Sequence, residues 1–181
     1  MLQVFGFSRI GVLAADIFHL DPEPSEGQEG AERGVRLEVR ILERGELPGS
    51  IDASVPIRVG RPLWRADLLE TVDSAPGSMN RAHHHPAMGP DWEPSRRVFD
   101  QGLSAAPVDW VGERLRDLEG LLAEAGVELD EELAADAREL RAWVPEITRA
   151  VAGLLDRVWA GELAMSPPGF PELIEARTGW L

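Results

Sequence analysis

The first half of the chain alternates apolar and polar residues in the way that strands do. In residues 35–41 every second residue is Val, Leu or Ile, and Arg and Glu stand between them. This period of two predicts a strand with one buried face. Residues 2–20 predict one long bent strand or a hairpin, with bulges at Gly6 and Gly11. Further strands are expected at residues 54–59, 63–72 and, for a short one, 96–99.

From Pro107 onward the apolar period changes to that of a helix. Apolar residues recur at steps of three and four and trace one helical face: Val108, Val111, Leu115, Leu118 and Leu122. Pro107 suits a first turn and Gly126 suits a C-terminal cap. A second helix is expected from Asp130, whose carboxylate suits an N-cap. Because proline lacks a backbone N–H, Pro145 should break or kink this helix, and we favour a break, with a third helix continuing to Gly161.

These patterns predict a single α+β domain over residues 1–181. An antiparallel sheet within about residues 1–100 is covered by two or three helices within about residues 107–160, and residues 161–181 form a tail. With 181 residues, 44% of them hydrophobic, the chain is long enough to bury one core. Residues 22–33 are acidic, rich in Pro and Gly, and nearly without apolar side chains. We expect them to be a disordered loop, because they bury too little to offset the entropy of ordering.

The amino-acid composition limits the kinds of partner and the cellular compartment that we expect for this protein. The formal net charge is −14, and all 18 basic residues are arginine. An acidic protein repels phosphate backbones, so nucleic acid is a disfavoured partner. The chain has no cysteine, so a metal ion would need histidine and carboxylate ligands. The apolar start lacks the basic region of a signal peptide and no segment suits a membrane crossing, so we expect a cytoplasmic protein without a membrane partner.

Three of the four histidines stand side by side in NRAHHHP, residues 80–86. A residue before proline tends to be extended, and in an extended segment His83 and His85 share one side while His84 points to the other. Two imidazoles with this spacing can chelate one ion. A carboxylate on a neighbouring strand would be the third ligand, and the candidates are Asp67, Asp73, Asp91 and Glu93. Two histidines and a carboxylate, for which we favour Asp67, leave open positions on a divalent ion for water or substrate.

A polar site without a metal is an alternative. Arg65 and Asp67 alternate with the apolar residues around them, so we expect both to point outward. With His84 they would form an acid–base group, since histidine beside a carboxylate is a common pairing in catalysis. His19 is expected to be a core histidine, unless its strand neighbours residue 67 and brings it into the site. Four arginines could form an anion-binding patch or pair with the local acids instead: Arg65, Arg81, Arg96 and Arg97. The remaining interpretation is a loop with no chemical role, either exposed to solvent or with its imidazoles bonded to carboxylates and backbone carbonyls.

Two families share local features with this region. Gly77 followed by His83-x-His85 resembles the first metal motif of the cupins, which are small β-barrel proteins, but the later glutamate and histidine ligands of that family have no counterpart at the matching positions. Arg65-x-Asp67, the three histidines and Val98-Phe99 are similar in order to TumE-type toxins of bacterial toxin–antitoxin pairs, although the acidity fits poorly with an RNA target. As a whole, the chain resembles actinobacterial domain families of unknown function.

Two classes of function follow. The first is a small enzyme with a divalent metal ion on His83, His85 and Asp67 and a small-molecule ligand beside it. The second is a non-catalytic interaction protein with a protein partner, such as a member of a toxin–antitoxin-like pair. Neither a phosphate-binding glycine loop nor a nucleophile elbow is present in the sequence. No motif names a substrate or an oligomeric state.

Overall fold

A computed structural model describes residues 1–45, 56–89 and 91–167 of the chain. Within them, one antiparallel sheet has the strand order β1-β2-β3-β4-β5, so that each strand pairs with its neighbours in sequence. The strands are β1 (Leu2–Gly6), β2 (Ile10–Leu20), β3 (Ala31–Arg44), β4 (Ile57–Thr71) and β5 (His83–His85). The helices follow: α1 (Gln101–Ala105), α2 (Pro107–Arg116), α3 (Leu118–Glu124) and α4 (Glu131–Trp159). The α+β fold predicted from the sequence is confirmed.

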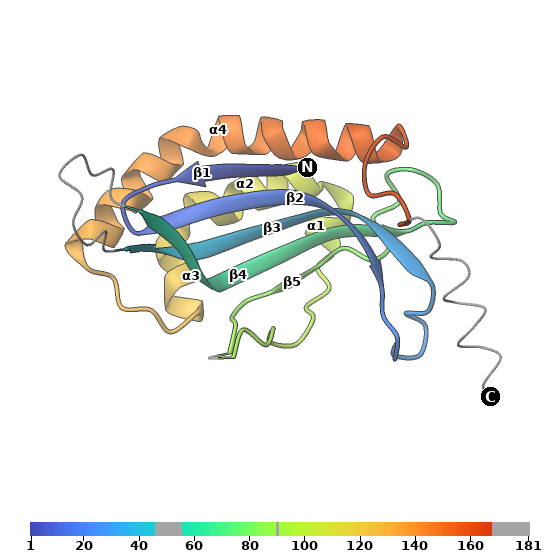
Figure 1. Ribbon diagram of the computed structural model, residues 1–181, viewed down its shortest axis with the longest axis horizontal. Helices are drawn as coiled ribbons and strands as arrows, with labels where there is room; N and C mark the ends of the chain where they lie inside the picture. Colours follow the sequence, from blue (N-terminus) through green and yellow to red (C-terminus); the bar gives the residue numbers. More distant parts are fainter. Residues whose placement is uncertain (46–55, 90, 168–181) are drawn as a thin grey trace.

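The helices lie on one face of the sheet, and α4 runs along its length (Figure 1). The strands turn their apolar residues toward this helical layer, and Trp64, Ala66 and Leu68 of β4 are fully buried. The facing residues of α4 form one continuous apolar stripe that includes Leu140, Val144, Ile147 and Val151. Each large side chain contributes about 1.5–3 kcal/mol on burial, so this interface is the main force holding the two layers together.

The sheet resolves one alternative that the sequence left open and corrects one strand prediction. Residues 2–20 form a hairpin, with Gly6 paired to Gly11 beside the turn. Residues 57–71 form one strand instead of two, and a shift of register opposite Arg40 absorbs Pro62, which has no N–H to donate. Residues 54 and 55 of the expected strand lie outside the described residues. The short strand expected at residues 96–99 is reduced to a single bridge between His84 and Val98.

Two helix predictions are wrong. The first helix is divided at Asp117, whose carboxylate accepts a hydrogen bond from the Gly120 N–H and so begins α3. Pro145 does not end the second helix, and α4 continues through it. The apolar stripe stays in phase on both sides of Pro145, so packing against the sheet outweighs the lost backbone hydrogen bond. The Thr148 hydroxyl donates to the Val144 carbonyl in the same turn.

The loop predicted at residues 22–33 is shorter than expected. Residues 31–33 belong to β3. Their backbone groups continue the ladder with β2 as far as the pair Leu20–Ala31, and this backbone pairing does not require apolar side chains. Residues 21–30 form a mostly exposed connection. Of the predicted tail, residues 168–181 lie outside the described residues. In the described part of the chain, no helix combines the length and the apolarity that a membrane crossing requires.

Candidate functional site

The pairing of β4 with β5 aligns the predicted site residues across the sheet. Asp67 lies opposite His83, and Arg65 lies opposite His85, in an antiparallel register. Side chains on directly opposed residues share a face, so all four point to the face that the helices leave free. The prediction that His83 and His85 share one side, together with Asp67, is therefore confirmed.

His84 lies on the other face, against the helical layer. Its ring centroid is 5.0 Å from that of Trp110 and 6.4 Å from that of Trp64. Burial lowers the pKa of His84 and keeps the imidazole neutral among these aromatic rings. The structure thus does not bring His84 together with Arg65 and Asp67, because successive residues of a strand point to opposite faces. The acid–base group predicted with His84 must be corrected accordingly.

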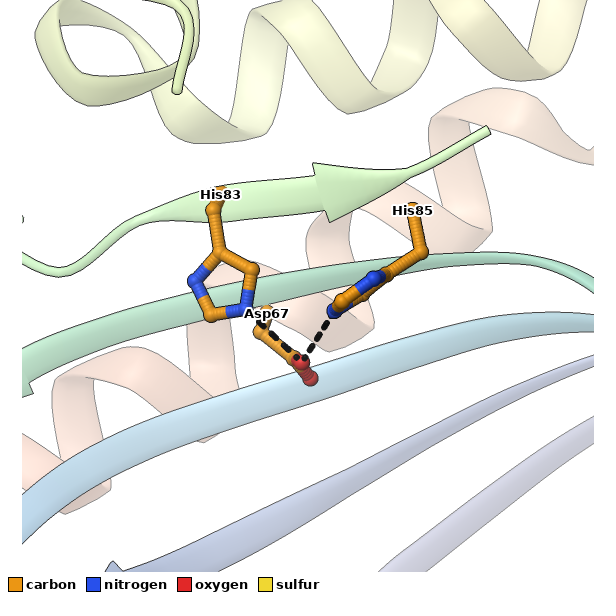
Figure 2. Close-up of side chains that lie close together, drawn as sticks. All are labelled: Asp67, His83 and His85. Carbon is orange, nitrogen blue, oxygen red and sulfur yellow. Dashed lines mark ion pairs between the residues drawn. The ribbon is translucent and has the colours of Figure 1, made fainter. Parts of the chain in front are cut away.

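Both imidazoles on the free face aim the same nitrogen at one carboxylate oxygen (Figure 2). Nε2 of His83 lies 3.4 Å, and Nε2 of His85 3.7 Å, from Oδ2 of Asp67. On the far side of each ring, Nδ1 faces a backbone carbonyl: that of Arg81 at 2.8 Å for His83, and that of Ser95 at 2.6 Å for His85. A carbonyl oxygen only accepts hydrogen bonds, so each Nδ1 carries the proton. In the neutral rings, both Nε2 lone pairs therefore face Asp67.

Two arginines share the Asp67 carboxylate with the histidines. Nε of Arg36 donates to Oδ1 at 2.6 Å, and Nε of Arg65 lies 3.0 Å from Oδ2. The Arg65 contact is an ion pair without hydrogen-bond geometry, since that Nε has no hydrogen-bond partner among the described residues. Instead, Nη2 of Arg65 donates to Nε2 of His85 at 3.0 Å. Arg36 is thus the firmly bonded partner of Asp67, and Arg65 the loosely bonded one.

The electrostatics of the group follow from its burial. Asp67 is 1% exposed, and burial alone would raise its pKa. A hydrogen bond from His83, formed when Nε2 carries a proton, and the charges of Arg36 and Arg65 outweigh burial and hold the pKa of Asp67 well below its ordinary value. Burial lowers the pKa of His85 to about 4, so this imidazole is neutral at pH 7. The Asp67 carboxylate and the His85 imidazole are thus in the protonation states that a metal ion requires of its ligands.

Asp67, His83 and His85 form a group that could hold a metal ion. One ligand atom from each lies within 4.8 Å of the others, and all three side chains are buried. Ligand atoms around a tetrahedral zinc ion stand roughly 3.3–3.6 Å apart, close to the two N–O distances found here. The structure thus selects one of the carboxylates that the sequence left open. The other three do not belong to this group: Asp73, Asp91 and Glu93.

The group opens into a polar cavity of about 300 Å³. Its lining residues come from four strands and the segments next to them: His19, Asp21, Glu32, Arg36, Arg65, Asp67, Leu69, His83, Pro94 and Arg97. His19 is half-buried on β2 and joins the site, although β3 separates its strand from β4; the expected core position is not what the structure shows.

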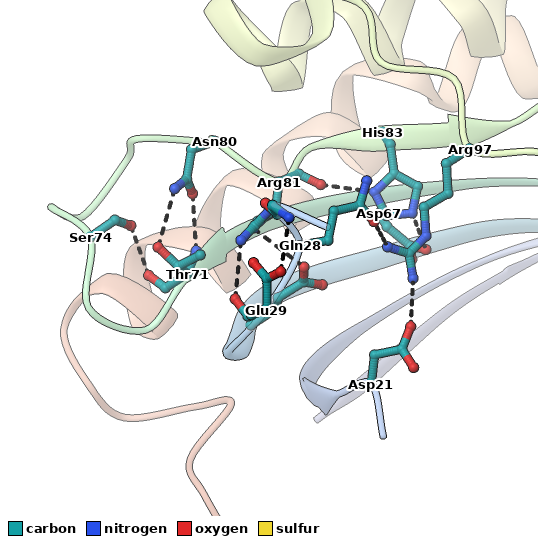
Figure 3. Close-up of polar contacts among 12 residues, drawn as sticks. Asp21, Gln28, Glu29, Asp67, Thr71, Ser74, Asn80, Arg81, His83 and Arg97 are labelled. Carbon is teal, nitrogen blue, oxygen red and sulfur yellow. Dashed lines mark hydrogen bonds and ion pairs between the residues drawn. The ribbon is translucent and has the colours of Figure 1, made fainter. Parts of the chain in front are cut away.

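Arginines from the segments beside β5 bind residues 21–30, the connection between β2 and β3 that lies beside this cavity (Figure 3). Arg97 donates to the side-chain oxygen of Gln28 and pairs with Asp21 at 3.5 Å. Arg81 donates to two backbone carbonyls in residues 21–30, those of Gly27 and Glu29. The anion-binding patch suggested by the sequence is not free to act as one. Its members Arg65, Arg81 and Arg97 face carboxylate, amide, imidazole or carbonyl acceptors, and Arg96 is exposed.

Sequence reasoning missed Arg36, Asp21 and Glu32 as site residues. Arg36 lies opposite Asp67 in the β3–β4 register, which makes it the nearest cross-strand partner on that face. The alternation of residues 35–41 indicates that Arg36 points away from the core, but it carries no information on register. Comparison of the chain with known protein families, curated proteins and solved structures finds no match. The geometry of the site is therefore the basis for a function.

Proposed function

We propose that the protein is a small enzyme that binds a divalent metal ion through His83, His85 and Asp67 and acts on a ligand in the adjoining cavity. The observation that carries this proposal is the orientation of the two imidazoles. Each donates Nδ1–H to a backbone carbonyl, and each directs the lone pair of Nε2 toward Oδ2 of Asp67. Backbone partners of this kind fix the tautomer of metal-binding histidines in many proteins.

The three atoms that would bind the ion are Nε2 of His83, Nε2 of His85 and Oδ2 of Asp67. They present only lone pairs or negative charge to one another. At 3.4 Å, a neutral His83 Nε2 and the Asp67 carboxylate repel each other unless a cation lies between them. A proton on Nε2 or a metal ion can serve as that cation. Because His85 presents a second lone pair to the same oxygen, an ion with several coordination positions satisfies all three groups at once.

A bound divalent ion would supply a Lewis acid at the edge of the cavity, able to polarise a ligand oxygen or acidify a bound water. Other residues of the chain would hold the metal-binding side chains in position. Arg36 holds the Asp67 carboxylate in place at both oxygens, with Nε donating to Oδ1 and Nη2 donating to Oδ2, the oxygen that also faces the histidines. The carbonyl groups of Arg81 and Ser95 hold the rings at their angle. Three ligands leave open positions for water or substrate.

A second candidate function is an acid–base site without a metal, and the position of Arg65 favours it. The Arg65 guanidinium lies 3.0 Å from both Asp67 Oδ2 and His85 Nε2, so it contacts two of the atoms that a metal would bind. A metal ion would have to displace it. In the alternative, Arg65 is the permanent cation, and His83, held beside the Asp67 carboxylate, exchanges protons with the ligand.

Calorimetric titration with zinc, manganese and nickel separates the two candidates. The chain is purified without an affinity tag, because its own histidines would confuse a tag-based preparation, and is stripped of metal with EDTA. The proposal predicts binding to the native chain, and equal or tighter binding to Arg65→Gln, in which the competing cation is gone. Arg33→Gln is the matched control, since Arg33 pairs with Glu70 outside the group. Absence of binding in both the native chain and Arg65→Gln would favour the acid–base site.

A further inference from the structure

Glu32 is a buried carboxylate with an oxygen that nothing in the described chain satisfies. It lines the cavity from β3, is 4% exposed, and its Oε2 has no hydrogen-bond partner among the described residues. Its nearest cation is Arg81, whose Nε lies 3.6 Å from the other oxygen, Oε1. The terminal nitrogens of Arg81 donate to the carbonyls of Gly27 and Glu29, and its Nε makes no hydrogen bond to Glu32.

Glu70 shows what a structural carboxylate looks like on the same sheet. It is 1% exposed, and one oxygen accepts from Arg33 at 3.1 Å. The other accepts from the backbone N–H groups of Gly77 and Ser78 at 2.7 and 3.2 Å. A buried polar atom left without a partner costs about 1–3 kcal/mol, and more when it is charged. Glu70 avoids that cost within the fold, whereas Glu32 does not.

The residue across from Glu32 is also unpaired. His19 lies opposite Glu32 in the β2–β3 register and lines the same cavity. Its imidazole makes no hydrogen bond or ion pair with another described residue. One wall of the cavity thus carries an acceptor and an imidazole without partners, while Asp67 and His83 on another wall contact each other.

We infer that Glu32, with His19 beside it, binds a cationic N–H group of a small organic ligand, an ammonium or a guanidinium. A donor of this class neutralises a carboxylate that Arg81 neutralises only at a distance, and rotation of the carboxyl group lets it supply the hydrogen bond that Oε2 lacks. The cavity volume of about 300 Å³ suits a small molecule rather than a macromolecule. Identifying this ligand as a substrate rests on the proposed function, but its binding does not.

Binding is tested with methylguanidinium as the probe and tetramethylammonium, a cation without N–H donors, as its control. Both are titrated by NMR into the full chain in EDTA at constant ionic strength. We expect methylguanidinium to bind with a Kd in the millimolar range, roughly tenfold more weakly to Glu32→Gln, and equally to Glu43→Gln, which removes a charge from β3 outside the cavity. Equal binding of both cations, equal binding to Glu32→Gln, or no binding to the native chain would overturn the inference.

Thermal unfolding supplies a readout that needs no ligand. We expect Glu32→Gln to melt within about 2 °C of the native chain or above it, and Glu70→Gln to melt about 5–10 °C lower or not to fold. If Glu32→Gln does not fold or loses as much as Glu70→Gln, Glu32 is structural and the inference is wrong. Zinc affinity of Glu32→Gln should stay within about twofold of native. If the native chain binds no zinc, that result therefore counts against the proposed function and not against the inference about Glu32.

Discussion

The two faces of β4 are equally buried near the site but filled by opposite chemistry. Trp64, Ala66 and Leu68 meet the helices on one face, and each is 0% exposed. Asp67, between them in sequence, is 1% exposed on the other face, among arginines and histidines. Apolar burial stabilises a fold without specific partners, whereas a buried charge is stable only where each partner is placed. The apolar face therefore supplies most of the stability of the fold, and the charged face has the specifically placed partners expected of a functional site.

The largest effect is expected when the helical layer is removed. A fragment of residues 1–104 keeps all five strands but loses α2, α3 and α4, which cover the apolar face. We expect far-UV circular dichroism to show a poorly folded sheet without a cooperative thermal transition, because the exposed apolar face has no other cover. A fragment that unfolds cooperatively would show that the charged face can hold the sheet by itself, and would indicate two domains.

Asp67→Asn should produce the next largest effect. It keeps the shape of the side chain but leaves Arg36 and Arg65 without their shared carboxylate. We expect the free energy of unfolding to fall by roughly 2–4 kcal/mol, below the full value for a deeply buried pair because Arg36 reaches water. Urea denaturation measures it. The neighbouring change Thr71→Ser on the same strand should shift stability by less than about 1 kcal/mol. A native-like midpoint for Asp67→Asn would contradict the importance of the ion network.

The pH dependence of stability should reveal the buried histidines. In the unfolded chain a histidine titrates near pH 6.5, but burial lowers the pKa of His85 to about 4 and that of His84 in the same direction. Between these values the unfolded chain binds more protons, so the free energy of unfolding falls as the pH drops from about 6.5 to about 4. We expect a loss on the order of 1 kcal/mol at pH 5 in EDTA, after allowance for solvent screening.

His85→Gln is the variant that sharpens this test, because it should flatten the pH dependence, whereas His19→Gln should not. His19 is the natural control, as it is only half-buried. Denaturant midpoints at pH 7.5 and pH 5 give the comparison. A native chain that is equally stable at both values would mean that His84 and His85 are not held neutral by burial.

Period and phase predicted the fold class, the antiparallel sheet and the opposite sides of His84 and its two neighbours. These properties depend on residues close in sequence, as with His83, His84 and His85. Register does not, and so the alignment of Arg36 with Asp67 was not predictable. Packing between distant elements also overrode a local rule at Pro145, where the apolar stripe continued the helix. The cavity needed both kinds of information, since it draws on residues 19–97. The alternative of a protein partner stays a prediction.

The most direct test of the metal site compares single alanine variants of adjacent histidines. Calorimetric titration of zinc at pH 7.5 should show binding to the native chain and a loss of about 100-fold or more for His83→Ala and for His85→Ala. His84→Ala, whose side chain faces the helices, should stay within about threefold of native affinity. The contrary result is a native chain that binds no ion, or a His84→Ala variant that loses affinity as severely as its neighbours.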